Sequence, residues 1–482
     1  MNSLFQHIES WANHEPARIA LQDGRQEICY RDLWQQIQRL ARDLQAAGIR
    51  RLALRLDNGL DWALADLACG LAGIVVIPVP TFFSDRQQAW LLDSSGADAL
   101  IGKTPAGWHE TKLAGLPLAR HQPRILTSLP AQTAKITYTS GTTGQPKGVC
   151  LSLDQQVRTC EALAQRIASA HVEQHLTLLP LSTLLENLTG LYVPLLLGAT
   201  STIPSLAEAG FTGSSRLDPQ RLAATIRLHQ PHSLVLVPEL LRLVVTQNEN
   251  QPEIGRSLRF VAVGGGKVSP ELIRRAKALG LPVFEGYGLS ECGSVVALNT
   301  PDDEAIGSVG RPLPHLAVRI AQDGEIIVRG AAMLGYLGET EAAPQEIATG
   351  DLGHLDAAGF LHVTGRKKNV QITAFGRNFS PEWIESEAEH CPAIARAVIF
   401  GDGLAQNVAL IEPRPGTEAQ LAEQIAALNE RLPDYARVHR WFVPEQPLST
   451  CGLLTTNGRP RRERILQTFA TRILQLAQGE PA

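Results

Sequence analysis

A run of small and hydroxyl-bearing residues between two predicted strands has the chemistry of a phosphate-binding loop. It lies between the predicted strand Lys135 to Tyr138 and Lys147, and consists of Thr139, Ser140, Gly141, Thr142, Thr143 and Gly144. Small residues let the backbone approach a polyphosphate, amides and hydroxyls donate hydrogen bonds to its oxygens, and the lysine adds a mobile positive charge. A polar turn is the plain alternative for one such loop. Gly148 follows Lys147 where a Walker A loop has Ser or Thr, so a kinase or P-loop ATPase is disfavoured.

Three later segments carry side chains that suit a nucleotide. They read EGYGLSE over residues 285–291, TGDLG over 349–353 and GRKKNVQITAFGRNFSPEWIE over 365–385. Taken alone, Tyr287 is as well explained as a core aromatic, Glu291 as a surface carboxylate and Asp351 as a turn residue. Together with TSGTTGQPKG, however, the segments closely resemble, in order and approximate spacing, the motifs of the adenylate-forming superfamily. That family contains acyl-CoA synthetases, luciferases and peptide-synthetase adenylation domains.

The resemblance implies a role for each matching residue. Tyr287 would stack on adenine, Asp351 would accept hydrogen bonds from the ribose hydroxyls, and Arg366 would reach the ribose or a phosphate. Glu291 would hold Mg2+, because this hard cation takes oxygen ligands and neutralises charge on the transferring phosphates. The ATP site expected on this basis comprises Thr139, Ser140, Gly141, Thr142, Thr143, Gly144, Lys147, Glu285, Gly286, Tyr287, Asp351 and Arg366.

The resemblance also implies one site that serves two half-reactions. The substrate carboxylate attacks the α-phosphate of ATP and expels pyrophosphate, and a small C-terminal domain then rotates so that a thiol attacks the acyl-adenylate. Lys368 matches the family's hinge, and the loop that begins with Phe375 and Gly376 resembles the segment lining the thiol tunnel. The expected cofactors are therefore ATP, Mg2+ and either coenzyme A or the phosphopantetheine of a carrier protein.

One expected catalytic residue departs from the family pattern. Near the C-terminus the family places a lysine after a short Thr/Gly turn, where it contacts the substrate carboxylate and ATP oxygens. This chain reads TTNGRPRRERI there, so the matching residue is Arg459, whose planar fork replaces a compact point charge. Either Arg459 performs the role with altered geometry, or adenylation is slow, or the chain binds nucleotide without completing synthesis. We favour the first account, which makes Arg459, Lys147 and Glu291 the catalytic set.

The acid is expected to be apolar. Amino-acid-activating members carry an aspartate early in the segment after their LP-type strand, whereas this chain reads LPLSTLLENLTG, with Leu184 and Leu185 at that place. The pattern resembles the long-chain acyl-CoA synthetases, and the expected acyl pocket comprises Leu184, Leu185, Gly264, Gly265 and Gly288. Glycines leave room for adenine and an acyl chain near the backbone, but a tight turn needs them too. A fatty, aryl or branched acid therefore stays open, with a fatty acid favoured.

Coenzyme A is the default acceptor. The insertion that the resemblance would imply for acyl-AMP ligases of lipid pathways is not apparent between Asp351 and Gly365. An acyl-AMP ligase that loads a carrier protein is the first alternative. A non-catalytic nucleotide-binding protein, motivated by Arg459, is the second.

The elements expected to position these residues form an α/β fold. Through the first 365 residues, short apolar runs alternate with amphipathic helical patterns, as in Ser233 to Pro238 and Arg259 to Val263, which predicts βαβ units around a largely parallel sheet. Ser269 and Pro270 predict a helix start, and residues 356–359 a turn. A domain boundary is expected near Lys368, giving an N-terminal AMP-binding domain over residues 1–366 and a small, mobile α+β domain over 367–482.

Bulk properties fit a globular enzyme with more than one domain. The chain has 482 residues, 44% hydrophobic and 19% charged, and a formal net charge of −4, which gives no electrostatic reason to expect nucleic acid. Seven cysteines without a C-x-x-C pair fit neither a disulfide scaffold nor a zinc site, so a reducing cytoplasm is expected. The N-terminus has no signal-peptide pattern, and no apolar run is long enough to span a membrane.

Overall fold

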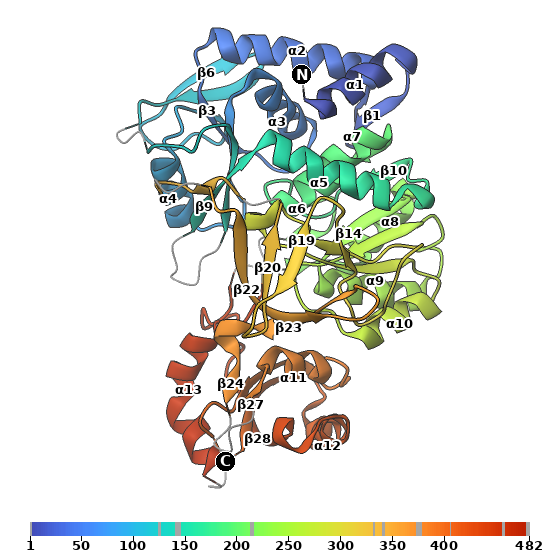
Figure 1. The fold of residues 1–482 in the computed structure, drawn as a ribbon, viewed down its shortest axis with the longest axis vertical. Helices are drawn as coiled ribbons and strands as arrows, with labels where there is room; N and C mark the ends of the chain where they lie inside the picture. The colour runs from blue at the N-terminus through green and yellow to red at the C-terminus, as the bar shows by residue number, and fades with distance from the viewer. Residues whose placement is uncertain are drawn as a thin grey trace.

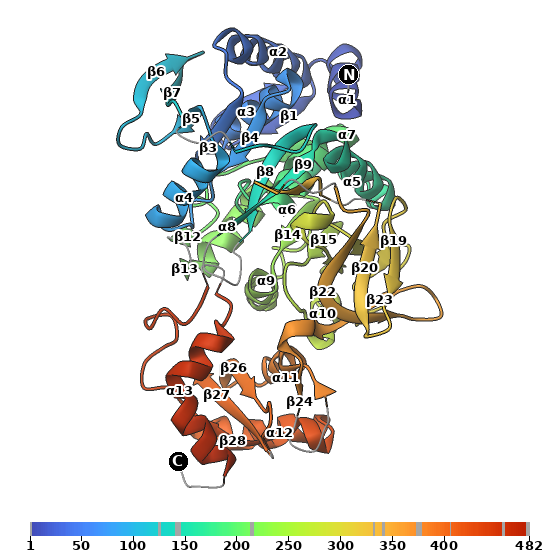
Figure 2. The ribbon, with the colours of Figure 1, turned by 60° about the vertical axis from the view of Figure 1, so that its left-hand side comes forward.

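The computed structural model describes residues 2–123, 127–139, 146–212, 216–330, 333–339, 343–372, 378–404, 406–455 and 458–478. Its body is built from large sheets with helices packed on their faces, and α11, α12 and α13 lie together in a lobe at one end (Figures 1 and 2). Within the described ranges, no helix is long and apolar enough to cross a membrane.

The first large sheet carries the predicted βαβ units. Its order is β18 (Arg311–Pro312), β17 (Ala297–Leu298), β16 (Val283–Tyr287), β15 (Phe260–Val263), β14 (Ser233–Leu236), β10 (Gln174–Leu176), β11 (Thr200–Thr202), β1 (Ile19–Gln22) and β2 (Glu27–Cys29). The strands from β16 to β1 pair in parallel, with α9 (Pro238–Asn250) and α10 (Pro270–Ala278) connecting β14, β15 and β16. The parallel strands therefore end at one edge, where connecting loops gather binding residues.

A second large sheet carries the predicted phosphate loop. Its order is β21 (Gly335–Tyr336), β9 (Lys147–Ser152), β8 (Thr133–Thr139), β4 (Val75–Pro78), β3 (Arg51–Arg55), β5 (Ala99–Gly102), β7 (Leu116–Arg120) and β6 (His109–Leu113). Strands β8 and β9 pair antiparallel, so the loop connects two neighbouring strands rather than a strand and a helix. The helices of this half of the chain are α1 (Ser3–His14), α2 (Tyr30–Ala46), α3 (Leu60–Ala72), α4 (Asp85–Ser95), α5 (Leu153–Arg166), α6 (Leu184–Glu186), a π-helix (Asn187–Tyr192), α7 (Val193–Leu197) and α8 (Pro219–His229).

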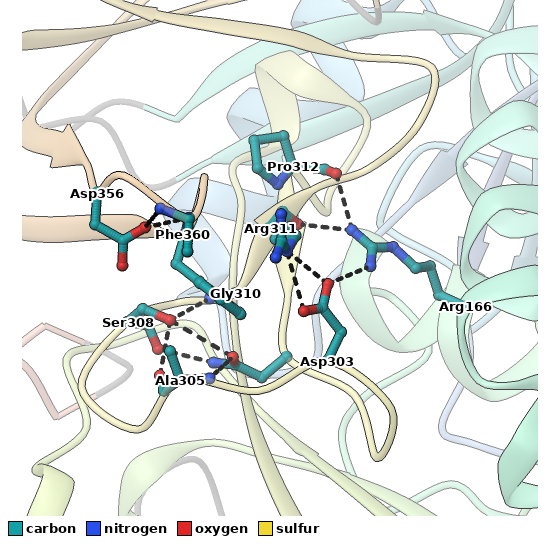
Figure 3. A network of polar contacts seen from close by, with 11 residues as sticks. Arg166, Asp303, Ala305, Ser308, Gly310, Arg311, Pro312, Asp356 and Phe360 are labelled. Carbon is teal, nitrogen blue, oxygen red and sulfur yellow. Dashed lines mark hydrogen bonds and ion pairs between the residues drawn. The ribbon is translucent and has the colours of Figure 1, made fainter.

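A smaller antiparallel sheet flanks this body. It comprises β19 (Ala317–Ile320), β20 (Glu325–Arg329), β22 (Glu346–Leu355) and β23 (Leu361–Arg366). The predicted turn before β23 forms, because Gly359 N–H donates to the carbonyl of Asp356 at 3.0 Å. Arg166 of α5 and Arg311 of β18 both pair with Asp303, and the carboxylate of Asp356 accepts from Phe360 N–H in the turn before β23 (Figure 3). The Arg311 guanidinium lies 4.6 Å from the ring centroid of Phe360, which brings the two groups together.

The C-terminal lobe has its own hydrophobic cores, which are formed by residues between Phe379 and Ala477. It contains the short pair β24 (Gln371–Ile372) and β25 (Asn378–Phe379), a sheet of β26 (Ile394–Phe400), β27 (Asn407–Pro413) and β28 (Val438–Phe442), and the helices α11 (Pro381–Ala388), α12 (Leu421–Arg431) and α13 (Arg462–Ala477). The domain boundary near Lys368 stays a prediction.

The helix starts show why the sequence patterns were informative. Ser269 caps α10 as predicted, because its side chain accepts hydrogen bonds from the N–H groups of Glu271 and Leu272. At α11 the same Ser-Pro pattern begins a helix differently, since Ser380 makes no cap bond and its hydroxyl instead donates to Glu382 at 2.9 Å. Proline at the first helical position is common to both.

Candidate active site

One large cavity, of about 2140 Å³, lies between the sheets and the C-terminal lobe. This exceeds the roughly 300–1,000 Å³ of a usual small-molecule pocket, as a site for several substrates would require. Every predicted site residue that the structure describes lines it: Thr139, Lys147, Leu184, Leu185, Gly264, Gly265, Glu285, Gly286, Tyr287, Gly288, Glu291, Asp351, Arg366, Lys368 and Arg459. The predicted residues Ser140, Gly141, Thr142, Thr143, Gly144, Phe375 and Gly376 lie outside the described residues.

The base of the predicted phosphate loop opens into this cavity. Thr139 and Lys147 face each other as partners in the β8–β9 ladder, and both line the cavity. The Lys147 ammonium lies 5.1 Å from the ring centroid of Tyr336, within cation–π range. Gly148 must be glycine here, because a Cβ at this position would come within 2.9 Å of Ile136. The β8–β9 ladder therefore places the Lys147 ammonium against the Tyr336 ring at the cavity wall.

A buried carboxylate, Asp351, has two donors in the cavity. Tyr287 O–H donates to Asp351 Oδ2 at 2.6 Å, and Arg366 Nε pairs with Asp351 Oδ1 at 2.7 Å. Asp351 and Arg366 are cross-strand partners in the β22–β23 ladder, which fixes their contact. Burial raises the pKa of Asp351, while Arg366 and the Tyr287 hydrogen bond act in the opposite direction. The three residues predicted to hold adenine and ribose thus form one connected unit.

The predicted metal residue lies on another wall. Glu291, in a short 3-10 helix after β16, accepts a 3.0 Å hydrogen bond from the hydroxyl of Tyr336 through Oε1. Among the described residues, no group of three or more His, Cys, Asp or Glu side chains could enclose a metal ion. Mg2+ is commonly held by one or two carboxylates plus substrate phosphates, so a single carboxylate facing a nucleotide cavity fits that ion.

Glycines let the backbone line the cavity between the nucleotide side and the acyl side. Gly265 has a φ of +76°, which favours glycine, and Gly264 N–H donates to the carbonyl of Leu236 at 3.0 Å. At Gly288 a Cβ would lie 1.7 Å from the carbonyl oxygen of Ser294, so no side chain fits. The glycine pattern therefore has a steric cause at these positions.

Apolar side chains make the wall beyond these glycines. Leu184 is buried at the start of α6, and Leu185 is half-buried beside it. The remaining apolar lining comes from α5, α7 and the central strands, and includes Leu163, Ile167, Val193, Leu197, Phe260 and Ala262. A π-helix interrupts this wall at residues 187–192, a feature frequently found at functional sites.

Arg459 reaches the cavity from the C-terminal lobe. Its backbone is held by reciprocal bonds with Thr455, of 2.7 Å to the threonine N–H and 3.0 Å to the threonine hydroxyl. The side chain approaches the glycine turn, since a Cβ placed on Gly266 would lie 3.9 Å from Arg459 Nη2. The positive charge of Arg459 also acts to lower the pKa of Asp351.

The neighbouring arginines are occupied elsewhere. Arg461 donates to the carbonyl of Leu454 at 2.9 Å, and Arg462 makes bonds of 2.7 and 2.8 Å to Glu385. These bonds commit both neighbours to other partners, so neither is free to replace the cation at Arg459.

The lobe also contacts the body directly through the end of α11. Glu389 forms an ion pair with Arg242 of α9, and His390 hydrogen-bonds with Ser269, the cap of α10. Burial raises the pKa of Glu389 to about 7, even though the Arg242 charge lowers it. These contacts hold the lobe in the orientation that places Arg459 in the cavity.

Tyr336, Lys267 and His175 are among the polar residues of the cavity that sequence reasoning missed. Burial lowers the pKa of Lys267, and the charge of Glu285 opposes that shift. Burial in turn raises the pKa of Glu285 to about 8. No spacing pattern pointed to these residues, although Lys267 directly follows the glycine run.

Comparison with known proteins gives a consistent result. Residues 8–337 match the family model described as AMP-binding enzyme, and residues 369–480 match the AMP-binding enzyme C-terminal domain. Long-chain-fatty-acid–CoA ligase FadD15 of Mycobacterium bovis is 28% identical over 461 residues, covering 75% of this chain and 74% of that protein. The 2-succinylbenzoate–CoA ligase of Bacillus subtilis is 26% identical, covering 89% and 91%.

A solved structure shows the same fold. The o-succinylbenzoate CoA synthetase of Bacillus subtilis, in complex with its acyl-adenylate intermediate, superposes with a TM-score of 0.76 at 24% identity, covering 95% of this chain and 97% of that one. The predicted α/β body with a C-terminal domain is thereby confirmed. With family models matching most of its length, the chain belongs to the AMP-binding enzymes of the adenylate-forming superfamily, in the class of acid–thiol ligases.

Proposed function

We propose that this enzyme joins an apolar carboxylic acid to AMP with ATP and Mg2+, and then passes the acyl group to coenzyme A. The observation that carries the proposal is that one cavity is shared by the predicted nucleotide and acyl residues. Tyr287, Asp351, Glu291 and Arg459 line it together with the apolar wall around Leu184, so an acid and a nucleotide can meet there.

The nucleotide roles follow from the side-chain chemistry. The Tyr287 ring, fixed through its hydroxyl, offers a face for adenine, and Asp351 can accept from two ribose hydroxyls while keeping its Arg366 contact. Lys147, at the base of the loop, supplies a cation for phosphate oxygens. Glu291 would hold Mg2+, which stabilises charge on the transferring phosphate.

Arg459 would stabilise the first half-reaction. As the carboxylate attacks the α-phosphate, negative charge accumulates on phosphate oxygens, and a fixed cation facing that position lowers the barrier. The arginine is always charged, and its backbone is anchored to Thr455. A non-catalytic nucleotide-binding protein could use the same cation for phosphate binding alone, so the first half-reaction itself must be measured to separate the two accounts.

The second half-reaction would require movement of the lobe. We propose residues 1–366 and 367–482 as the two domains and Lys368 as the hinge, which lies exposed just after β23. The preceding residue is anchored to the body, because Lys367 Nζ bonds to Asp323 and Glu325 at 2.7 Å each. Rotation beyond this anchor would withdraw Arg459 and admit the thiol.

The apolar lining supports a fatty or otherwise apolar acid as substrate. The relatives differ in their acid substrates, since one acts on long-chain fatty acids and another on 2-succinylbenzoate. Leucine, isoleucine, valine and phenylalanine side chains dominate the acyl wall, so burial of hydrocarbon would drive binding at roughly 25 cal/mol per Å².

Pyrophosphate release from ATP, measured over a panel of medium, long and aromatic acids with and without coenzyme A, tests the proposal. Release with one acid class, followed by thioester formation with coenzyme A, is the expected result. Pyrophosphate release with a thioester formed only on a holo-carrier protein would show that the acceptor is a carrier protein rather than coenzyme A. Nucleotide binding without release for any acid would refute the ligase function.

A further inference from the structure

Two buried ionisable side chains beside the acyl wall take no part in the steps above. His175, the middle residue of β10, is 3% exposed and lines the cavity. Glu186, the last residue of α6, is 0% exposed. His175 Nε2 and Glu186 Oε1 lie 4.0 Å apart, which is too far for a direct hydrogen bond.

Each of these side chains is held at one end and unpaired at the other. His175 Nδ1 bonds to Ser233 Oγ at 2.8 Å, and Glu186 Oε1 accepts from Leu178 N–H at 3.0 Å. In the part of the chain that the structure describes, His175 Nε2 and Glu186 Oε2 have no hydrogen-bond partner. Leaving a buried polar atom unpaired is unfavourable, so a ligand group that pairs with these atoms would gain binding free energy.

Burial shifts both groups towards their uncharged forms. Burial lowers the pKa of His175 to about 3, and burial raises the pKa of Glu186 despite backbone hydrogen bonds that lower it. A neutral imidazole and a protonated carboxyl offer no counter-charge, so a charged substrate group would be buried at high cost. If His175 Nδ1–H is assigned as the donor to Ser233, Nε2 accepts while the Glu186 carboxyl donates. A hydroxyl group can satisfy both atoms at once.

The strand register shows how far His175 lies, along the strand direction, from the glycine turn at Gly264. His175 pairs with Ser233, Ser233 pairs with Phe260, and Phe260 is four positions before Gly264 of the glycine turn. Four residues of a parallel strand span roughly 13 Å. A substrate group that reaches His175 must therefore be separated from the reacting carboxylate by an extended apolar stretch.

We propose that His175, together with Glu186, recognises a hydroxyl group at the far end of the acyl chain. The preferred acids are thus apolar acids that carry an uncharged hydroxyl distant from the carboxyl. The inference rests on the proposed ligase function and narrows its substrate class. His175 is a specificity residue in this account, because it contacts the substrate far from the reacting atoms.

Matched pairs of acids test the inference directly. Straight-chain acids of increasing length would be compared with their terminally hydroxylated counterparts, by kcat/KM for thioester formation. The wild-type enzyme is expected to prefer the hydroxylated member about 5- to 30-fold at the length that reaches His175, as one buried hydrogen bond implies. His175→Phe should abolish this preference and favour the unsubstituted acid.

Two further variants separate recognition from structure. Glu186→Gln keeps an uncharged donor and should retain the preference, whereas Glu186→Leu should lose it. His229→Phe, the same exchange at the end of α8 and away from the cavity, should leave the preference unchanged.

Equal kcat/KM for both members of every pair, in the wild-type enzyme, would overturn the inference without any variant and leave the ligase function intact. An unchanged preference in His175→Phe would also overturn it, and would indicate that only water bridges His175 and Glu186. Absence of pyrophosphate release with every acid would instead refute the underlying ligase function.

Discussion

Tyr287 and Asp351 meet through a 2.6 Å hydrogen bond although they belong to different sheets. Tyr287 ends β16 of the large parallel sheet, and Asp351 lies within β22 of the smaller antiparallel sheet. Asp351 is 3% exposed and its second oxygen is occupied by Arg366. The bond therefore fixes the proposed adenine-binding ring relative to the proposed ribose-binding carboxylate.

Tyr287→Phe should weaken ATP binding more than it slows the chemistry. The variant keeps the aromatic face but leaves a buried oxygen of Asp351 without its donor, a loss of about 1–2 kcal/mol. The KM for ATP should rise about 5- to 30-fold, with a smaller change in kcat. Steady-state kinetics with ATP as the varied substrate measure both constants.

Tyr192→Phe provides the matched control. It removes the same hydroxyl from a buried tyrosine that donates to Asp66 at 2.7 Å, within a polar cluster that includes Lys135. This variant should lower the melting temperature while leaving the KM for ATP near the wild-type value. An equal rise in the KM in both variants would contradict a specific nucleotide role for Tyr287.

Arg459→Ala should impair adenylation far more than thioester formation. Loss of a fixed charge that stabilises developing phosphate charge costs about 100- to 1,000-fold in comparable sites. Pyrophosphate exchange reports the first half-reaction, and thioester formation from a supplied acyl-adenylate reports the second. Arg440→Ala, at an exposed arginine of β28, is the control for loss of one positive charge in the same lobe.

Arg459→Lys examines the geometry of the same position. The substitution keeps a positive charge and introduces the residue that the family pattern has there, so adenylation should equal or exceed that of the wild-type enzyme. Wild-type exchange rates in Arg459→Ala would remove this residue from the mechanism.

Local patterns predicted the elements that carry their own signals. The run SLVLVP became β14 followed by α9, with Pro238 at the first helical turn, and Ser269 became the cap of α10. The order of strands within each sheet could not be predicted from one sequence, because pairing depends on contacts between segments far apart in the chain. The antiparallel pairing of β9 with β21, far later in the chain, is one such case.

Site residues could be predicted where they belong to a recognisable motif, but not where only tertiary packing brings them to the cavity. Asp351 and Glu291 belong to recognisable segments, and both line the cavity. Tyr336, which donates to Glu291, and the buried His175 come from segments without a chemical signature in one sequence. Their burial and orientation arise from tertiary packing, which sequence spacing does not encode.

Lys368→Pro should spare adenylation and block thioester formation. The wild-type residue lies in a short 3-10 helix, Lys367–Asn369, where a fixed φ would restrict the proposed rotation. Pyrophosphate exchange should stay near the wild-type rate while thioester formation falls at least about 10-fold. A normal second half-reaction would refute Lys368 as the hinge.

The Glu389–Arg242 contact should make adenylation sensitive to pH. The pKa of Glu389 is about 7 when α11 is docked, against a value of 4.5 for an ordinary glutamate, because burial outweighs the opposing charges of Arg242 and Arg396. Glu239 and Glu385 also raise it. The docked state therefore binds more protons between these two values, so docking is strongest below about pH 4.5, weakens as the pH rises towards 7, and changes little above it.

Comparison with Glu389→Gln isolates this effect. The amide stays uncharged at every pH and resembles the protonated carboxyl, so the ratio of wild-type to variant exchange rates cancels titrations that both proteins share. The ratio should be highest near about pH 5, fall as the pH rises to about 7, and level off above it. A ratio that rises with pH would show that the ionised pair stabilises docking more than burial of the carboxylate opposes it, contrary to the shift at Glu389.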